Sequence, residues 1–332
     1  MGTRSAGLGT AVVAKLSTGA LHWIRLHSGF LDSPSGRAEL PLTPRVKALL
    51  QLALLRRSWE RVAPRDPGLA EVTGTLGRVW RDPGFPLLLA AEPRYAWQFR
   101  LAYGALAPAG ITDGPHPAVL ADVAAGGLLT PRRQSPFGSL ETRYYADLAG
   151  VRHSLRPYRE LYEAGRLARH GDDRPLDELD VCDVTHTVFH LTDFGFRAPD
   201  PDDPRTVALT GAALEHARDR VCRLTEATVR RGEWDLTGKL VLAQHCLGLD
   251  PLRTQSGAAG LRMLAAVQSP GGAIPGRSAD DRADTAATTV EFFRKAYQST
   301  VVTALATLTV LHGRPDGADD AEERSPAVRG AR

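Results

Sequence analysis

Apolar residues along the chain recur mainly three and four positions apart, which is the spacing of an amphipathic helix. Runs that alternate with a period of two, as strands do, are scarce. The pattern predicts helices over 6–27, 43–63, 68–82, 93–107, 115–126, 139–150, 157–168, 178–194, 205–230, 235–247, 255–267 and 286–311. We therefore expect an all-α protein.

The segments between these helices are rich in proline, glycine and aspartate, as in "FRAPDPDDPRT". We divide the chain into an N-terminal helical portion over 1–150, packed on a C-terminal portion over 151–312. The tail over 313–332 has almost no apolar residues; it reads "GRPDGADDAEERSPAVRGAR". We expect it to be disordered, because it cannot bury enough apolar surface to offset the entropy of ordering.

Two features predict that helical hairpins of the C-terminal portion are arranged as an α/α toroid. The stretches "LTGKLVLAQHCLGL" and "STVVTALATLTVL" are apolar nearly all round, so other helices must cover them. The segment "QSPGGAIPG" at Gln268–Gly276 is similar to the glutamine- and glycine-rich repeat of squalene-cyclase-like folds, although it lacks the tryptophan of that repeat. This resemblance covers nine residues and implies a toroid.

The composition excludes several classes of protein. Hydrophobic residues make up 43% and charged residues 24% of the 332, which is typical of a soluble globular protein. The net charge of +3 is spread along the chain without basic runs interleaved with aromatics, so nucleic acid is not an expected partner. No run of 18 apolar residues predicts a membrane span. Three cysteines without a C-x-x-C pair indicate a reducing cytoplasm.

The candidate site lies in "DVCDVTHTVFHLTDFGF", at Asp180–Phe196. On a helix, Asp183, His186, His190 and Asp193 fall within about 80° of arc. No lysine, arginine or glutamate lies between the first and the last of them. Polar groups in such an apolar setting must be paired, hydrated or used in chemistry.

Three interpretations of this stripe are open. His186 and His190 have the i, i+4 spacing of metal ligands, with Asp183 or Asp193 as a third ligand for a divalent metal, but the glutamate of H-E-x-x-H is replaced by Thr187. Alternatively, the stripe lines a cavity where His186 acts as acid or base and one aspartate orients it. The third interpretation is a structural network that ties inner helices together.

Weaker candidates for substrate binding follow on two later helices: Trp234, Asp235, His245, Tyr297 and Gln298. Asp235 has the position of an N-cap for an apolar helix, and His245 lies near the other end of that helix. Tyr297 and Gln298 stand at the entry to the last apolar run, where inner helices of α/α toroids often face the cavity.

Two acidic motifs suggest prenyl or terpene cyclase chemistry as an alternative. "DPDD" at Asp200–Asp203 matches the D-x-D-D of cyclases that protonate an alkene, and "DDRAD" at Asp280–Asp284 matches the D-D-x-x-D that binds Mg²⁺ and diphosphate. Both lie in loops flanked by proline or glycine, where acidic residues are usually solvated. Aromatic residues total 6%, which is low for a cavity that stabilises carbocations.

No G-x-S-x-G, Walker or Rossmann motif is present, so we expect no nucleotide cofactor. At "THTVFHLTDFGF", "WDLTGKLVLAQHCLGLDP" and "AYQSTVVTALATL", the chain resembles uncharacterised actinobacterial helical proteins encoded beside natural-product genes. This resemblance implies a cytoplasmic tailoring enzyme of specialised metabolism with a small-molecule or carrier-bound substrate. The alternative is a non-enzymatic scaffold that binds a partner protein through an apolar surface patch. The oligomeric state stays open.

Overall fold

The computed structural model describes residues 2–85, 96–108, 110–111, 135–169, 177–284 and 289–313, with single positions at 89, 118, 121 and 125. In these residues all regular structure is helical, with no strand, so the all-α prediction is confirmed. None of the described helices has the length and apolar character that a membrane crossing needs. The predicted helix over 115–126 and the tail after Gly313 lie almost wholly outside the described residues.

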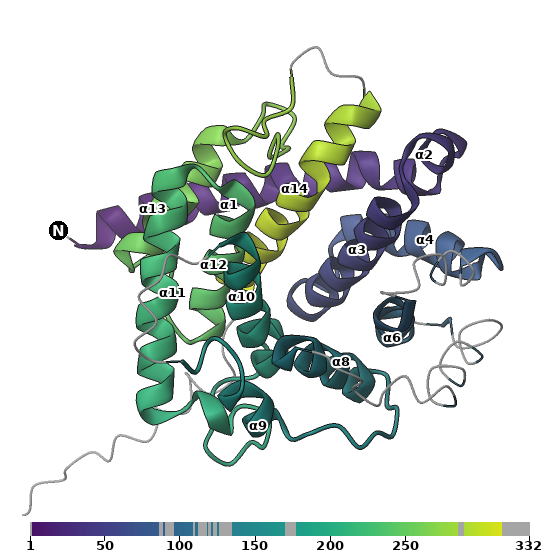
Figure 1. Ribbon diagram of the computed structural model, residues 1–332. Helices are drawn as coiled ribbons and strands as arrows, with labels where there is room; N and C mark the ends of the chain where they lie inside the picture. Colours follow the sequence, from purple (N-terminus) through teal and green to yellow (C-terminus); the bar gives the residue numbers. More distant parts are fainter. Residues whose placement is uncertain are drawn as a thin grey trace, which may run out of the picture.

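Most helices begin and end within a few residues of the predicted positions (Figure 1). The α-helices are α1 (Gly2–Ser28), α2 (Pro34–Glu39), α3 (Leu42–Val62), α4 (Pro67–Arg81), α6 (Ala96–Leu106), α8 (Pro136–Leu148), α9 (Tyr158–Glu163), α10 (Glu178–Thr192), α11 (Gly211–Arg231), α12 (Trp234–Cys246), α13 (Gln255–Val267) and α14 (Thr289–His312). Three short 3₁₀ turns are η1 (Gly29–Asp32), η2 (Asp193–Gly195) and η3 (Val207–Leu209). The predicted helix over 205–230 begins only at Gly211, because the preceding residues form turns and η3.

Side-chain caps explain where several helices begin. The side chains of Ser33, Asp66 and Ser135 each accept a hydrogen bond from a backbone N–H of the first turn, and a proline follows each of them. Asp177 and Thr254 cap α10 and α13 in the same way. These residues satisfy N–H groups that have no partner within the helix, and proline is favoured at the first helical position.

Six helices close a ring in the part of the chain that the structure describes. In order around the ring, each packs against the next: α3, α6, α8, α10, α12, α14 and back to α3 (Figure 1). The helices α1, α4, α9, α11 and α13 pack against this ring from outside. The ring takes helices from both sides of residue 150, and one hydrophobic core extends from Val13 to Leu308. The toroid of C-terminal hairpins and the boundary at residue 150 therefore stay predictions.

The apolar helices α12 and α14 are covered by others, as their sequences require. Every residue of α12 from Trp234 to Gln244 is buried, because α10, α11, α13 and α14 pack around it. In α14 the buried hydroxyls of Thr300, Thr307 and Thr309 donate to backbone carbonyls four residues earlier. These threonines therefore need no partner from a neighbouring helix.

The segment Gln268–Gly276 docks on α1. The Gln268 side chain donates to the carbonyls of Leu16 and Gly272, each over 2.9 Å. Gly272 has a φ of +93°, and a Cβ there would lie 2.0 Å from the carbonyl oxygen of Gly19. Only glycine fits this close backbone contact. The glutamine and glycines of this segment thus have a structural role at the described contact.

Candidate functional site

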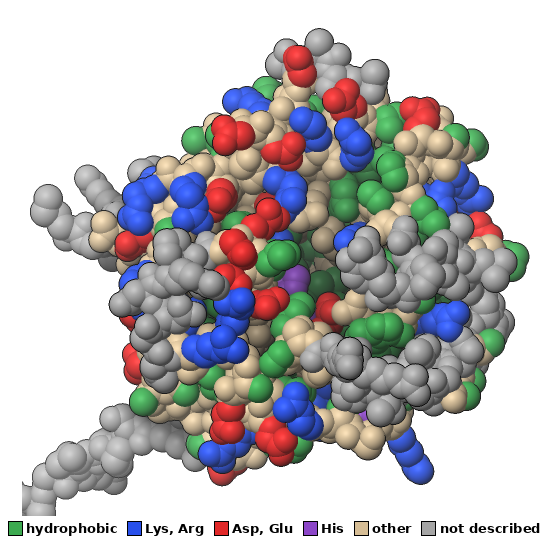
Figure 2. Space-filling view, viewed as in Figure 1, with side chains coloured by type: hydrophobic (Ala, Val, Ile, Leu, Met, Phe, Trp, Pro, Cys, Tyr) green, Lys and Arg blue, Asp and Glu red, His purple; other side chains and the backbone are tan. Residues whose placement is uncertain are grey.

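The ring of helices surrounds a hollow that opens on the face shown in Figure 2, where a histidine lies recessed among hydrophobic and acidic side chains. We call it the central hollow. The helices of the ring carry half-buried polar side chains that are candidates for its wall: Glu141 on α8, Cys182, Asp183 and His186 on α10, and Gln298 on α14. Charges on α3, α8, α10 and α12 interact here, since Lys47 and Asp183 act on Glu141, and Lys239 acts on His186.

His186 and His190 lie one turn apart on α10, with ring centroids separated by 6.1 Å and ring planes tilted by 56°. His190 is buried against Tyr144 at a centroid distance of 4.7 Å, and Phe137 lies 5.7 Å from the ring of His186. Burial lowers the pKa of His186 to about 3, helped by the charge of Lys239, and burial also holds the pKa of His190 well below its usual value of 6.5. Both rings are therefore neutral at pH 7.

Neither histidine makes a hydrogen bond to any residue that the structure describes, and Nδ1 of His190 is fully shielded from solvent. Buried polar groups in folded proteins nearly always have a partner. A structural network, the third interpretation of the stripe, requires satisfied rings. The described contacts leave the three interpretations of the stripe as predictions, and the half-buried His186 is more accessible to water or a ligand than His190, which aromatic side chains enclose.

Glu141 brings a carboxyl from α8 to the same region. It accepts a hydrogen bond of 2.7 Å from the side-chain amide of Gln98 on α6. Burial and the negative charge of Asp183 raise its pKa to about 7, against the opposing charge of Lys47. At neutral pH the carboxyl is thus divided between its two protonation states and can give or take a proton.

Asp235 and Lys239 form a buried ion pair on α12. Oδ2 of Asp235 accepts from Nζ of Lys239 over 2.7 Å and from the amide of Gln298 over 3.0 Å. Burial opposes the charge of Lys239, but Asp235 and the thiol of Cys182, whose sulfur lies 3.7 Å away, raise its pKa overall. The N-cap interpretation of Asp235 is wrong, because α12 begins at Trp234 and Glu233 occupies the cap.

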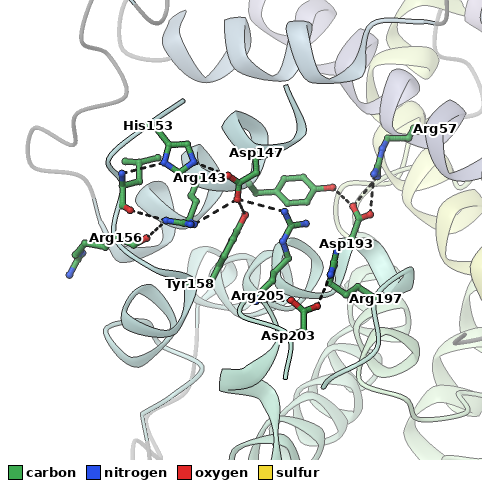
Figure 3. A network of polar contacts seen from close by, with 12 residues as sticks. Arg57, Arg143, Asp147, His153, Arg156, Tyr158, Asp193, Arg197, Asp203 and Arg205 are labelled. Atoms are coloured by element: carbon green, nitrogen blue, oxygen red, sulfur yellow. Dashed lines mark hydrogen bonds and ion pairs between the residues drawn. The ribbon is translucent and has the colours of Figure 1, made fainter. Parts of the chain in front are cut away.

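Asp193 has different partners from those that the helical stripe suggested (Figure 3). Its carboxylate accepts two hydrogen bonds of 3.0 Å from Arg57, one of 2.7 Å from Arg61 and one of 2.8 Å from the hydroxyl of Tyr144. Burial raises the pKa of Asp193, but these bonds outweigh it and lower the pKa overall. The carboxylate thus joins the end of α10 to α3 and α8, and His186 is not among its described partners.

The backbone changes direction at the same point. The predicted helix over 178–194 ends at Thr192, because Asp193 and Phe194 have φ values of 50° and 60° and Gly195 follows with 88°. Two consecutive non-glycine residues in the left-handed region cost energy and persist only where the surroundings impose them. The arginines that hold Asp193 provide that constraint.

The structure separates the weaker candidates. Asp235 reaches the wall of the central hollow through its bond to Gln298, while Trp234 is buried. Tyr297 is also buried, and its hydroxyl donates to a carbonyl of α3 over 3.4 Å. His245 lies ten residues after Asp235 on α12, which is about 15 Å along the axis. Asp235 and Gln298 thus belong to the group around Lys239, whose charge acts on His186, whereas His245 lies beside Gly195, after the end of α10.

Four of the six aspartates in the acidic motifs are exposed, and the other two, Asp203 and Asp281, are half-buried in ion pairs. Asp200 and Asp202 are exposed, and Asp203 is paired with Arg197 over 2.6 Å (Figure 3). Asp280 and Asp284 are exposed as well. Their positions give no support to prenyl or terpene chemistry. The metal-binding interpretation has no support from the described ranges either. In these ranges, no three histidine, cysteine or acidic side chains are close enough to hold an ion.

Sequence reasoning missed Glu141, Cys182 and Lys239. A signal for two of them was present. Lys239 is the one charged residue between Leu236 and Gln244, and it follows Asp235 by four positions, the spacing of a helical ion pair. Cys182 precedes His186 by four positions, so it lies on the same face of α10. Nothing in the local sequence distinguishes Glu141 from the glutamates that are exposed to solvent.

The sequence was compared with families, with curated proteins and with solved structures. A family described as a domain of unknown function, DUF6895, matches residues 17–308. No curated protein and no solved structure matches the chain. The matched range contains every residue of the central hollow.

Proposed function

Since the chain belongs to the DUF6895 family, whose description names no activity, we propose from the site itself that it is an enzyme. In this proposal it catalyses proton transfer on a small organic molecule bound in the central hollow. The observation that carries the proposal is the pair of histidine rings on α10 without described hydrogen-bond partners, together with the raised pKa of Glu141, whose carboxyl interacts with Asp183 on the same helix. Side chains whose pKa values are pushed in opposite directions are characteristic of acid–base sites.

The two groups have complementary roles. Glu141, with a pKa of about 7, is the proton donor when it is protonated. His186, neutral at pH 7, accepts a hydrogen bond or a proton from the substrate. Solvent that enters the open face then restores both groups after each turnover. Asp193 supports the site from a distance, because it fixes Tyr144, against which His190 is packed.

The surroundings favour a largely neutral substrate with an apolar or aromatic part. Phe137 and Tyr145 lie beside the histidines, and aromatic side chains bind flat apolar groups well. The buried ion pair of Asp235 and Lys239 is internally compensated, so it adds little net charge. This environment suits a tailoring step such as an isomerisation or a dehydration.

The proposal extends to the metabolic role of the enzyme, its compartment and the kind of substrate. The resemblance to actinobacterial proteins encoded beside natural-product genes supports a role in specialised metabolism, and the unpaired cysteines support the cytoplasm. The substrate is a free small molecule or one bound to a carrier. A scaffold that docks through an apolar patch has less support, since Leu26 and Leu179 are the large hydrophobic residues exposed in the described ranges.

The test is a comparison of conversions in a metabolite extract of the source organism, followed by mass spectrometry. Wild-type protein is compared with Glu141→Gln and His186→Ala variants, and with Asp219→Asn as a matched control. Asp219 is exposed and paired with Arg223 on α11, so the control removes a carboxylate outside the hollow. Far-UV circular dichroism verifies that each variant is folded.

We expect the extract to contain a compound that the wild type and the control convert. The Glu141→Gln and His186→Ala variants should each convert it at least about 100-fold more slowly. The rate with wild type should also change near pH 7, where Glu141 titrates, and this change should be absent in Glu141→Gln. If Glu141→Gln and His186→Ala both convert the compound at the wild-type rate, the acid–base roles of these two residues are refuted. If the wild type converts no compound, the enzyme hypothesis is rejected in favour of a non-catalytic binding function.

A further inference from the structure

A second concave site lies on another side of α3, and we call it the arginine groove. It has a volume of about 630 Å³ and runs between the C-terminal half of α3, the length of α4 and the chain at Pro108 and Ile111. This volume is within the range of small-molecule sites. Arg56 lines the groove, whereas its neighbour Arg57 turns toward Asp193, about 100° away around the helix.

Arg56 forms the floor of the groove. The residue is 6% exposed, and it donates from Nε to the hydroxyl of Thr73 over 3.1 Å and from Nη2 to Glu60 over 2.8 Å. Nη1 makes no hydrogen bond to a described residue, yet it is not among the atoms cut off from solvent. A nearly buried guanidinium thus keeps free N–H groups, and the groove is the space that they border.

Two further arginines border the groove without an acidic partner. Arg65 and Arg81 form no ion pair in the part of the chain that the structure describes. On α4 the groove is bordered by Gly74 and Gly77, and a Cβ at Gly77 would lie 3.4 Å from Nη1 of Arg81. The Arg81 side chain therefore lies along a stretch of helix that has no side chains to cover it.

The two acidic residues at the groove are already engaged. Glu60 accepts from Arg56, and Oδ1 of Asp66 caps α4 by accepting from the N–H of Gly68 over 2.8 Å. The groove therefore has a positive character. Leu69 and Ala70 add an apolar wall beside the guanidinium groups.

We propose that the arginine groove binds an organic anion, with its phosphate or carboxylate group on Arg56, Arg65 and Arg81 and its apolar part on the wall of α4. Guanidinium groups match the geometry of both oxyanions and are weakly hydrated, so they form strong charge-assisted hydrogen bonds. The missing side chains at Gly74 and Gly77 leave room for the ligand. This site is independent of the acid–base function proposed for the central hollow.

Isothermal titration calorimetry with three probes tests the proposal: phenyl phosphate, benzoate and the neutral benzyl alcohol. Arg81→Gln removes one guanidinium, and Gly74→Leu fills the groove without changing charge. A Cβ at Gly74 would have one neighbour within 4 Å among the described residues, the guanidinium of Arg78 at 3.7 Å, and the position is exposed, so this variant is expected to fold. Arg223→Gln on α11 is the control, since it removes the same charge from an exposed pair.

We expect phenyl phosphate, benzoate or both to bind the wild type and the control with a Kd below about 1 mM, and benzyl alcohol to bind at least tenfold more weakly. Arg81→Gln and Gly74→Leu should each raise the Kd for the anions about tenfold or more. The anion that binds more tightly identifies the head group. Failure of both anions to bind the wild type, equal binding of the alcohol, or unchanged binding in both variants would overturn the proposal.

Discussion

Replacing Asp193 with asparagine tests whether the contacts at the end of α10 hold the ring of helices together. Asparagine also tolerates the left-handed backbone conformation, so the substitution leaves the turn unstrained relative to wild type. It removes the negative charge that receives two hydrogen bonds from Arg57 and one from Arg61. Tyr144 can still donate to the amide oxygen.

The expected cost follows from the burial of the partners. Removing one partner of a buried ion pair costs about 3–5 kcal/mol, because the remaining charge is left uncompensated. The side chain of Asp193 is 10% exposed, but those of Arg57 and Arg61 are 20% and 39% exposed, so water offsets part of the loss. We therefore expect the free energy of unfolding to fall by about 2–3 kcal/mol. With an unfolding entropy of about 2.1 cal/mol/K per residue, this corresponds to a decrease in Tm of about 3–4 °C.

Urea denaturation followed by far-UV circular dichroism measures the difference, and Asp219→Asn serves as a control. Asp219 and Arg223 are 62% and 61% exposed, so their pair should contribute less than about 0.5 kcal/mol. The pH dependence gives a second readout. The pKa of Asp193 is lowered from 3.8, so its stabilisation is present above the unfolded pKa and is lost as pH falls through the folded pKa. The gap between wild type and Asp193→Asn should therefore narrow below about pH 4.

If Asp193→Asn lowers the free energy of unfolding by less than about 1 kcal/mol at pH 7, Asp193 does not hold α10 to α3 and α8. A gap that stays constant into strong acid would show that the charge is not the cause. Either result would refute the assignment of Asp193 as the residue that ties the ring together.

Three further changes test other parts of the molecule. The pKa of Glu141 is raised from 4.5 to about 7, so wild type should lose stability as pH rises between these values, and thermal unfolding of Glu141→Gln should not show this decline. Lys239→Met leaves buried Asp235 with Arg277, 3.8 Å away and 41% exposed, as its remaining cation and should cost about 3 kcal/mol in urea unfolding, whereas adding Asp235→Asn to it should restore part of that loss. Gly272→Ala places a Cβ against Gly19 and adopts a strained φ, so it should lower stability by about 2 kcal/mol or more, and a Tm equal to wild type would contradict the close contact.

Local patterns in the sequence predicted the helices well. The spacing of apolar residues located α3, α4, α10, α12, α13 and α14 to within a few residues. Caps such as Ser33 and Asp66 reinforce these boundaries, because the first turn of a helix needs acceptors that lie nearby in the chain. The same reasoning failed at Asp193, where distant arginines impose a turn that helical periodicity does not reveal.

The candidate site was predicted only in part. His186 and His190 are on one face of α10, as helical geometry required, and the structure keeps them together. Their environment was not predictable, since the neighbours are Phe137 and Tyr144 from α8 and the charge of Lys239 from α12. Which charges meet depends on how helices pack across the ring.

The sequence by itself determined that the chain is helical, where most helices begin and end, and which residues share a face. Those properties depend on contacts within a few residues along the chain. Only the tertiary structure decided that Asp193 is bound by α3, that Gln298 of α14 donates to Asp235 and that Glu141 of α8 interacts with Asp183 of α10. Desolvation and charge pairing depend on distances between residues far apart in the sequence, and these distances exist only once the helices have packed.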